Sequence, residues 1–305
     1  MVGQNIFQAY RELIPEVDRF NESLNQPMAR FLRVNTLRID PWKLTEMLGK
    51  RGHRVKPSPL SDDFLETVDP AGLRNTLEAA LGYFLFQALT SAVAVTALDP
   101  RPEEFVCDLC AAPGVKTTHM GQLMKNTGLI IANDSKERRL RVLEHNVRRL
   151  GVTNVITTQY AGQNFPRRWR FDRVLADVPC SGEGTIRYAP GSDQPPVREK
   201  KHHLIRAQQG LIVQAFDLLT AGGVLLYATC TYDPDENEAV VQHLLERRPA
   251  EILPIEVPLP HAPGVCQWRD KTYDRQMERC WRIYPHHINS VGFFLAKIRR
   301  QDTQD

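Results

Sequence analysis

The 305-residue sequence predicts an α/β fold, in which a mostly parallel sheet carries helices on both faces and is preceded by a small α+β unit. From Leu77 onward, apolar segments of strand length alternate with amphipathic segments of helix length, a pattern typical of parallel sheets. Before about Asn75 the predicted helices and strands are short and mixed. We therefore expect a small domain over residues 1–75 and a larger one over residues 76–305.

Short segments predict the elements of the N-terminal unit. We expect helices over residues 6–14 and 42–51, and strands over residues 30–37 and 54–56. Pro41 suits the first turn of the second helix and Gly52 suits its end, because proline is tolerated at a helix start and glycine favours the residue after a helix.

The hydrophobic periodicity of the larger domain is stronger than that of the N-terminal unit. Strands are expected over residues 105–109, 128–133, 154–158, 171–177, 223–228 and 291–298, and helices over residues 136–150, 204–219 and 236–247. In the first of these helices, Leu140, Leu143, Val147 and Leu150 recur at helical spacing and Gly151 closes the pattern. Residues 181–196 are rich in glycine and proline and predict a mobile loop.

One uncharged stretch, residues 79–98, has the length of a membrane helix. Gly82 interrupts it, and Gln87, Thr90 and Ser91 lie in its middle, so we expect a buried strand followed by a buried helix. Residues 1–17 contain no apolar block, which excludes a secretory signal peptide. The six cysteines are therefore expected to be reduced thiols of a cytoplasmic protein.

Basic residues gather in three segments, although the net charge is only +3. The three clusters are Arg138, Arg139, Arg141, Arg148 and Arg149; Arg167, Arg168, Arg170 and Arg173; and Arg198, Lys200, Lys201, His202 and His203. Each cluster alone suits an ordinary solvated surface. Three of them near one site favour a nucleic acid as partner.

The loops that follow the predicted strands carry unusual residues. The loop of residues 108–116 is built of small residues around Gly114, which lets a ligand approach the backbone closely. Asp134 ends the second strand, where an acid suits either the hydroxyls of a ribose or the start of the next helix. Because the phosphate-binding pattern G-x-G-x-x-G is missing, a nucleoside without phosphates, S-adenosylmethionine, fits better than a dinucleotide.

Two cysteines, Cys180 and Cys230, follow the fourth and fifth strands, so we expect both to face one cleft. A thiolate that adds to C6 of cytosine makes C5 nucleophilic enough to attack an electrophilic methyl group. An acid near N3 of the ring assists this addition, and Asp177 is the nearest candidate. These residues do not rank the two cysteines. The lone pair Cys107 and Cys110 has no partner pair at zinc spacing, so no metal site is expected.

These motifs resemble the Sun-type (RsmB/NSUN) RNA cytosine-5 methyltransferases. The matching segments are Asp-Leu-Cys-Ala-Ala-Pro-Gly-Val-Lys-Thr (108–117), Ala-Asp-Val-Pro-Cys-Ser-Gly-Glu-Gly-Thr-Ile-Arg (176–187), Tyr-Ala-Thr-Cys-Thr-Tyr (227–232), Glu236 to Glu238, Arg33 to Leu37 and Gln87 to Ser91. The resemblance spans roughly residues 30–300. It implies a Rossmann-like, seven-stranded methyltransferase sheet with a small N-terminal domain of an RNA-binding type.

The resemblance also implies the roles of individual residues. Cys230 is the expected nucleophile, Cys180 the cysteine that assists product release, and Asp177 and Lys116 further active-site residues. The expected S-adenosylmethionine site comprises Cys110, Ala111, Ala112, Pro113, Gly114, Val115, Lys116, Asp134, Arg139 and Asp177. The expected partner is ribosomal or transfer RNA, bound by a monomer with the target cytosine flipped or single-stranded. Candidate phosphate contacts in the N-terminal unit are Arg33, Arg51, His53 and Arg54.

The chain departs from the family pattern at two positions. Val115 stands where a second glycine is usual, and Ala161 stands where an aspartate is expected to contact adenine. We therefore expect weaker cofactor binding, with Gln163 or a backbone group as a substitute contact to adenine. Three alternatives stay open. A DNA cytosine-5 methyltransferase would use Cys180 as nucleophile, an amino-group methyltransferase would end its fourth strand in a different motif, and a non-catalytic RNA-binding or ribosome-assembly factor would keep only the fold.

Overall fold

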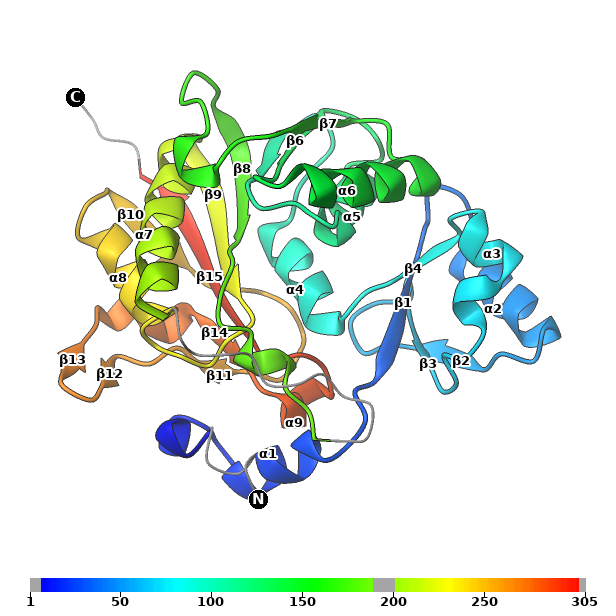
Figure 1. The fold of residues 1–305 in the computed structure, drawn as a ribbon, viewed down its shortest axis with the longest axis horizontal. Coiled ribbons are helices and arrows are strands. Elements are labelled where there is room, and N and C mark those ends of the chain that lie inside the picture. The colour runs from blue at the N-terminus through cyan, green and yellow to red at the C-terminus, as the bar shows by residue number, and fades with distance from the viewer. Residues whose placement is uncertain (1–6, 189–200, 302–305) are drawn as a thin grey trace.

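The computed structural model describes residues 7–188 and 201–301 (Figure 1). Within these residues the strands form a four-stranded sheet, a nine-stranded sheet and a two-stranded ribbon made of β12 (Gln267–Trp268) and β13 (Lys271–Thr272). The mixed α/β fold predicted from the sequence is confirmed.

The small sheet has the order β2-β3-β1-β4, and all of its neighbouring strands are antiparallel. Its elements are β1 (Arg30–Val34), β2 (Val55–Pro57), β3 (Phe64–Thr67) and β4 (Phe84–Phe86), with α2 (Pro41–Lys50), η3 (Leu73–Asn75) and α3 (Leu77–Ala80) packed beside them. Leu32, Leu44 and Phe84 are part of its core. The predicted strands and the helix that begins near Trp42 are confirmed. β4 pairs with β1 although it lies beyond Asn75, and the predicted division of the chain at residue 75 stays a prediction.

The large sheet has the order β11-β14-β15-β9-β8-β5-β6-β7, with β10 paired to β15. Its strands are β5 (Phe105–Asp108), β6 (Leu129–Asn133), β7 (Val155–Thr158), β8 (Phe171–Asp177), β9 (Leu219–Thr229), β10 (Ala250–Leu253), β11 (Ala262–Pro263), β14 (Trp281–Ile283) and β15 (Phe293–Arg300). The five strands from β9 to β7 are parallel, and β15 is antiparallel to β9. In the described residues this sheet has two strands more than the seven expected, because the segment between β9 and β15 adds short strands that show no periodicity.

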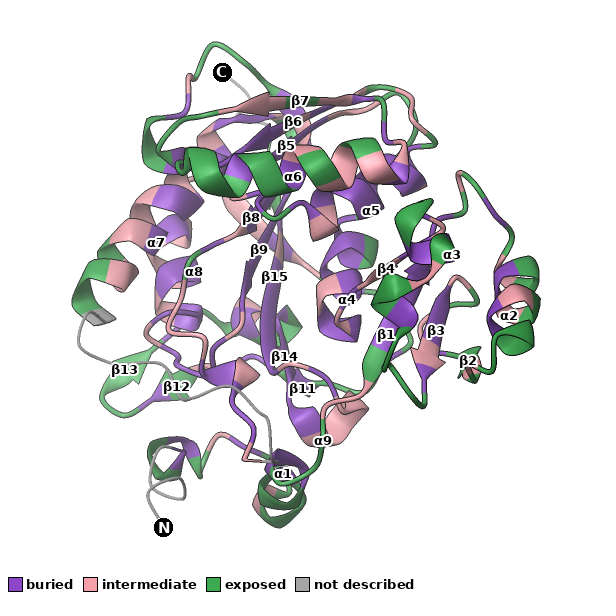
Figure 2. Ribbon diagram, turned by 45° about the vertical axis from the view of Figure 1, so that its right-hand side comes forward, coloured by how far each residue is buried: buried purple, intermediate pink, exposed green. Residues whose placement is uncertain are grey.

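Helices cover both faces of this sheet, as Figure 1 shows. They are α4 (Leu89–Leu98), α5 (Val115–Leu123) and α6 (Glu137–Leu150) on one side, and α7 (Lys201–Asp217) and α8 (Glu238–Leu245) on the other. Short turns occur at η4 (Gly162–Asn164), η5 (Glu183–Thr185), η6 (Arg275–Arg279) and α9 (Pro285–Ile288). Leu140, Leu143 and Leu150 bury one face of α6, whereas its opposite face is mostly exposed (Figure 2). The predicted pattern of this helix is therefore confirmed.

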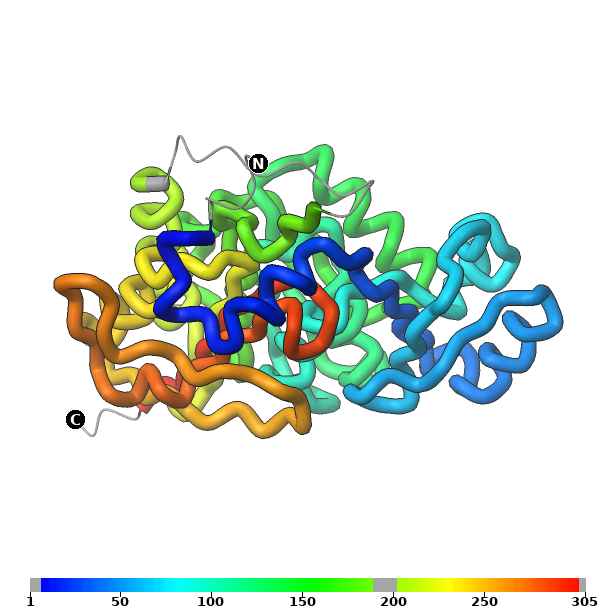
Figure 3. Tube along the Cα trace, turned by 90° about the horizontal axis from the view of Figure 1, so that it is seen from below, coloured from blue at the N-terminus to red at the C-terminus, as the bar shows by residue number. Residues whose placement is uncertain are grey.

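The predicted N-terminal helix over residues 6–14 is wrong. The described part of this segment contains only the 3-10 turn η2 (Gln8–Tyr10), and the helix α1 lies further on, at Val17–Leu24. Phe7 and Tyr10 are buried, but they pack against Tyr232 and Trp268 from the other end of the chain, so tertiary contacts explain their spacing. Figure 3 shows this N-terminal segment running beside the C-terminal part of the chain.

Residues 79–98 form α3 in part, β4 and the ten-residue helix α4, in agreement with the predicted strand and helix. No helix in the described ranges combines the length and apolar character needed to cross a membrane. Of the predicted mobile loop, residues 189–196 lie outside the described residues. Residues 181–188 contain η5, and the amide of Gly184 donates to the carbonyl of Cys230 at 2.8 Å.

Candidate active site

The predicted site residues lie where four parallel strands end. β6, β5, β8 and β9 are neighbours in the sheet and run in the same direction, so their carboxyl ends meet at one edge. Ligands of open α/β sheets bind at this edge. The loop after β5 carries residues 110–116, Asp134 follows β6, Asp177 ends β8, and Cys180 and Cys230 follow β8 and β9.

The two cysteines are in direct contact. The Sγ atoms of Cys180 and Cys230 are 3.3 Å apart, and the backbone amide of Cys230 also points to Sγ of Cys180 at 3.3 Å. Both side chains are partly buried, and no disulfide joins them. The predicted juxtaposition of the two thiols is therefore present.

Their surroundings favour different protonation states. A hydrogen bond from Cys180 has the largest effect and lowers the pKa of Cys230. Burial and the negative charge of Asp177 act against this effect, the positive charge of Lys116 adds to it, and the pKa is lowered on balance. The same hydrogen bond, with burial, raises the pKa of Cys180 well above its ordinary value. The thiolate of the pair is therefore favoured on Cys230, and a thiolate is the reactive form of cysteine.

An ion pair lies beside the thiols. Nζ of Lys116 is 2.6 Å from Oδ2 of Asp177, and Nζ also lies 5.5 Å from the ring centre of Phe293. The side chains of Lys116 and Asp177 are only 13% and 29% exposed, so water screens the pair weakly. This arrangement places one positive and one negative group next to the nucleophile candidates.

The loop that carries Cys180 is held by Glu236, which the sequence did not single out as a site residue. One carboxylate oxygen of Glu236 accepts from the amide of Ser181 at 2.9 Å and from the side chain of Gln208 at 2.8 Å. Gln208 also donates to the carbonyl of Pro179 at 2.9 Å. These bonds fix the backbone on both sides of Cys180.

The loop after β5 turns sharply into α5. Gly114 has φ +92°, and a Cβ there would lie 3.1 Å from Cγ of Leu143, so glycine suits this position. Val115 is the first residue of α5, which accommodates its branched side chain in ordinary helical backbone. The carbonyl of Val115 accepts from the buried guanidinium of Arg33 at 2.9 Å.

Asp134 lies at the end of β6 with only 2% of its side chain exposed. Its Oδ2 is 3.1 Å from Arg139, and its Oδ1 accepts from the amide of Lys136 at 3.0 Å. Arg139 also donates to the carbonyl of Ala112. Lys136, not Asp134, is the residue that begins α6 as its N-cap. A buried carboxylate at this edge of the sheet is an acceptor that suits the hydroxyl groups of the ribose of S-adenosylmethionine.

Two buried polar residues of this edge were not predicted. The Asn133 amide donates to the carbonyls of Leu109 and Tyr160 at 3.0 Å each, and so ties the loops after β5 and β7 together. Asp108 accepts from the hydroxyl of Thr117 at 2.7 Å, and burial raises its pKa to about 7. Their positions at strand ends were visible in the sequence, but their bonding partners were not.

Several of the basic residues that were predicted to contact RNA phosphates lie in other surroundings. Arg33 is buried and donates to Gln87 and Thr118 at 2.8 Å each, so its role as a phosphate contact is wrong. Arg51 is paired with Glu78 at 2.8 Å, whereas Arg54 is exposed and His53 is half-buried. Of the third basic cluster, Arg198 and Lys200 lie outside the described residues.

Ala161 is exposed in the turn that leads into η4, and Gln163 lies in η4.

Burial raises the pKa of the Cys107 and Cys110 thiols, which makes them unreactive. Within the described residues, no three or more His, Cys, Asp or Glu side chains are arranged to hold a metal ion.

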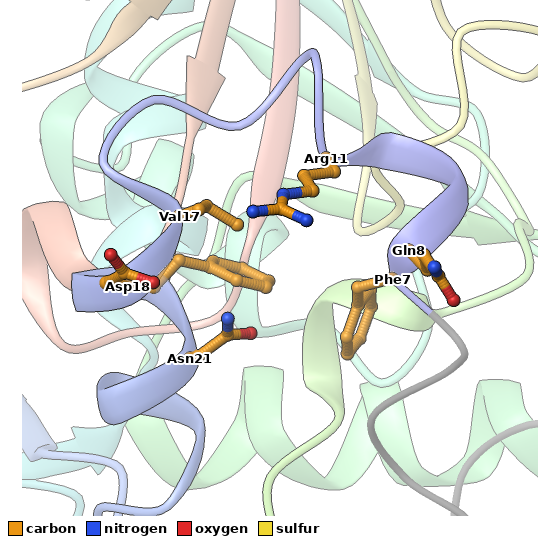
Figure 4. Close-up of a pocket in the computed structure, with 7 residues that line it drawn as sticks. Phe7, Gln8, Arg11, Val17, Asp18 and Asn21 are labelled. Atoms are coloured by element: carbon orange, nitrogen blue, oxygen red, sulfur yellow. The ribbon is translucent and has the colours of Figure 1, made fainter.

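A separate pocket of about 260 Å³ lies at the N-terminal segment (Figure 4). It is lined by Phe7, Gln8, Arg11, Val17, Asp18, Phe20 and Asn21. None of the predicted site residues belongs to this lining.

The fold and the strand-end site define a class of protein, the methyltransferases built on a Rossmann-like sheet. A methyltransferase homologue from Pyrococcus horikoshii superimposes with a TM-score of 0.83 and 33% sequence identity, over 94% of this chain and 91% of that one. NSun6 from the same organism, solved with the S-adenosylmethionine analogue SFG, gives a TM-score of 0.81 and 25% identity, over 94% and 95% of the two chains.

Within this class, residues 95–299 match the family described as 16S rRNA methyltransferase RsmB/F, and the chain belongs to that family. It is 34% identical to the tRNA (cytosine(49)-C(5))-methyltransferase of Pyrococcus abyssi, over 98% of this chain and 96% of that protein. It is 35% identical to the 25S rRNA (cytosine-C(5))-methyltransferase nop2 of Schizosaccharomyces pombe, over 98% of this chain but only 50% of that protein. The chain thus spans half of the yeast relative and nearly all of the archaeal one. The predicted family and its cofactor, S-adenosylmethionine, are confirmed.

Proposed function

We propose that this chain transfers the methyl group of S-adenosylmethionine to C5 of a cytosine in ribosomal or transfer RNA. The observation that carries the proposal is the contact between Cys180 and Cys230 at the cofactor edge of the sheet, with their Sγ atoms 3.3 Å apart. The names of the relatives, which are rRNA and tRNA cytosine-C5 methyltransferases, support the reaction and the substrate class.

In this proposal Cys230 is the nucleophile, because its surroundings favour the thiolate. Its sulfur forms a bond to C6 of the cytosine, and the electron pair of the C5–C6 double bond becomes available at C5. Asp177 lies beside the thiols and is placed to hold a proton at N3 of the ring while charge develops there. Lys116 keeps Asp177 in position through their ion pair and holds positive charge next to Cys230.

S-adenosylmethionine supplies the electrophilic methyl group to which C5 bonds. The residues that would hold it are those of the loop 110–116, together with Asp134, which binds the ribose, and Arg139, which fixes Asp134 and the carbonyl of Ala112. The small side chains of Ala111 and Ala112 keep the backbone of this loop accessible to the cofactor.

Release of the product requires two bonds to break. The proton leaves C5 to a base, and the bond between C6 and Cys230 then breaks with return of the electron pair to the Cys230 sulfur. Cys180 is held as a thiol against that sulfur, so we assign to it the role of assisting this expulsion. Glu236 keeps Cys180 in place through the backbone of the loop.

The target base must leave its stack to reach two thiols that are partly buried, so the RNA is bound with the cytosine unpaired or flipped. We further propose that the protein acts as a monomer in the cytoplasm, where a reducing environment keeps both thiols free.

Incubation of the purified protein with RNA transcripts and S-adenosylmethionine carrying a labelled methyl group tests the proposal. We expect label in 5-methylcytosine after digestion of the RNA, and none with the Cys230→Ala variant. The Cys266→Ser variant, which alters a distant thiol, serves as the matched control. Label in DNA but not in RNA, or methylation by Cys230→Ala but not by Cys180→Ala, points to the DNA-type enzyme. Absence of transfer to either, with intact RNA binding, points to a non-catalytic factor.

A further inference from the structure

A second pocket lies where the small sheet meets the large domain. It has a volume of about 380 Å³ and is lined by α3, β4 and the outer face of α6. β4 is the edge strand of the small sheet, and its residues Phe84, Leu85 and Phe86 form one wall, although the ring of Phe84 is buried in the core of that sheet. His145 and Arg149 of α6 form the opposite wall.

An aromatic ring and a guanidinium group lie together at this pocket. The guanidinium carbon of Arg74 is 5.0 Å from the ring centre of Phe86, which is half-buried. The neighbouring ring of Phe84 meets Phe86 edge to face, with 6.0 Å between ring centres. Aromatic rings and arginine planes are the groups on which unpaired bases stack.

The charge of the pocket is positive. None of the residues that line it in the described chain is acidic. Arg149 is held in place by bonds to the carbonyls of Ala79 at 2.7 Å and Phe84 at 3.5 Å. Burial and the nearby positive charge of Arg38 lower the pKa of Arg149. In the described part of the chain, no carboxylate lies within ion-pair distance of Arg38, Arg74 or Arg149, so an anionic ligand bound here would offset the repulsion between Arg38 and Arg149.

A row of basic residues leads from the cofactor edge of the sheet to this pocket. Arg138, Arg141, His145 and Arg149 are spaced by three or four residues, which places them on one face of α6. The row starts beside Asp134 and Arg139 and extends about 16 Å along the helix. Arg141 is paired with Glu137, but both side chains are highly exposed, so a phosphate competes easily for it.

We propose that this pocket binds an unpaired nucleotide of the RNA substrate outside the target cytosine, with its base stacked on Phe86 and its phosphates contacted by Arg74 and the row on α6. The inference rests on the proposed RNA substrate and deepens it, because it assigns a binding subsite for RNA remote from the two thiols.

Binding of a fluorescein-labelled single-stranded RNA 20-mer, measured by anisotropy at several salt concentrations, tests the inference. Phe86→Leu keeps an apolar side chain but removes the ring, and we expect about tenfold weaker binding. For Arg74→Gln we expect weaker binding and a salt dependence whose slope falls by about 0.7, the value for one phosphate contact on a single strand. Arg74 is exposed, so its replacement leaves the fold intact. Trp42→Ala, which removes an exposed aromatic residue of α2, is the matched control.

S-adenosylmethionine binding and methyl transfer at saturating RNA are measured in parallel and should stay at the wild-type level. Unchanged RNA affinity in both pocket variants, or an equal loss of RNA affinity in Trp42→Ala, contradicts the proposal that this pocket binds RNA. Either result leaves the proposed methyltransferase activity unaffected. A wild-type protein that neither binds nor methylates RNA overturns both proposals.

Discussion

The Sγ atom of Cys180 lies 3.3 Å from the Sγ atom of Cys230, at the ends of two adjacent parallel strands. Because the proton of Cys180 stabilises negative charge on Cys230, the contact favours a thiol at one position and a thiolate at the other. Their positions at the ends of two adjacent strands do not distinguish the two cysteines. Their hydrogen bond gives them different chemistry.

Cys230 should therefore react with iodoacetamide at a lower pH than an ordinary thiol, whose pKa is about 8.5. The alkylation rate rises with pH as the thiolate forms, so a lowered pKa moves this rise to lower pH. The variant Cys180→Ala lacks the hydrogen bond and should show the rise at higher pH. Mass spectrometry assigns the modified residue, with Cys230→Ala as the control. A rise at the same pH with and without Cys180 would count against the hydrogen bond.

Mild oxidation should inactivate the enzyme reversibly. Hydrogen peroxide oxidises the Cys230 thiolate to a sulfenic acid and releases hydroxide. The adjacent Cys180 thiol then attacks that sulfur, which forms a disulfide and releases water. Dithiothreitol should restore the wild-type activity. In Cys180→Ser no resolving thiol is present, so peptide mapping should find Cys230 oxidised further to the sulfinic acid, which dithiothreitol does not reduce. Peptide mapping that finds no Cys180–Cys230 disulfide would refute this expectation.

The variant Ala161→Asp should bind S-adenosylmethionine more tightly. Ala161 is exposed at the start of η4, a position that tolerates aspartate, and the new carboxylate offers an acceptor to the adenine. A charge-assisted hydrogen bond contributes about 1.5–3 kcal/mol, so we expect at least a tenfold gain by isothermal titration. Ala161→Asn is the uncharged control. An affinity equal to or weaker than that of the wild type contradicts the idea that the missing acid matters.

The fully buried ion pair of Glu238 and Arg282 should contribute strongly to the free energy of unfolding. Nε of Arg282 donates to Glu238 at 2.7 Å, and the two side chains are 0% and 2% exposed. Glu238→Ala leaves the guanidinium buried without its partner, so the free energy of unfolding should fall by about 3–5 kcal/mol. Glu46→Ala, which breaks the exposed pair with Lys50, should change little. Urea denaturation compares the two variants, and similar midpoints would disprove the difference.

Most of the sheet that carries the site was predictable because its elements have strong patterns. The β8 strand has the predicted bounds, and α6 follows the spacing of Leu140, Leu143 and Leu150. The strands β10 to β14 were missed because segments of two to four residues show no periodicity. The N-terminal helix was misplaced because Phe7 and Tyr10 have helical spacing but are buried by distant residues.

The reactive residues of the site were predicted better than the residues that hold them in place. The strand ends placed the two cysteines in one cleft, and the family resemblance ranked them. The bonds of Glu236 to the Cys180 loop join residues 55 positions apart, which no local pattern shows. Arg33 was predicted to be a surface cation, yet it is buried, and three acceptors bind the two terminal nitrogens of its guanidinium.

The division of labour between the cysteines is tested most directly by trapping the RNA–protein adduct. Cys180→Ser is mixed with labelled RNA and S-adenosylmethionine, denatured and run on a gel that separates free from protein-bound RNA. We predict that a covalent complex accumulates in Cys180→Ser, because Cys230 still attacks but is not expelled, and that it is absent in Cys230→Ser. A complex that forms in Cys230→Ser but not in Cys180→Ser would contradict the assignment of Cys230 as the nucleophile.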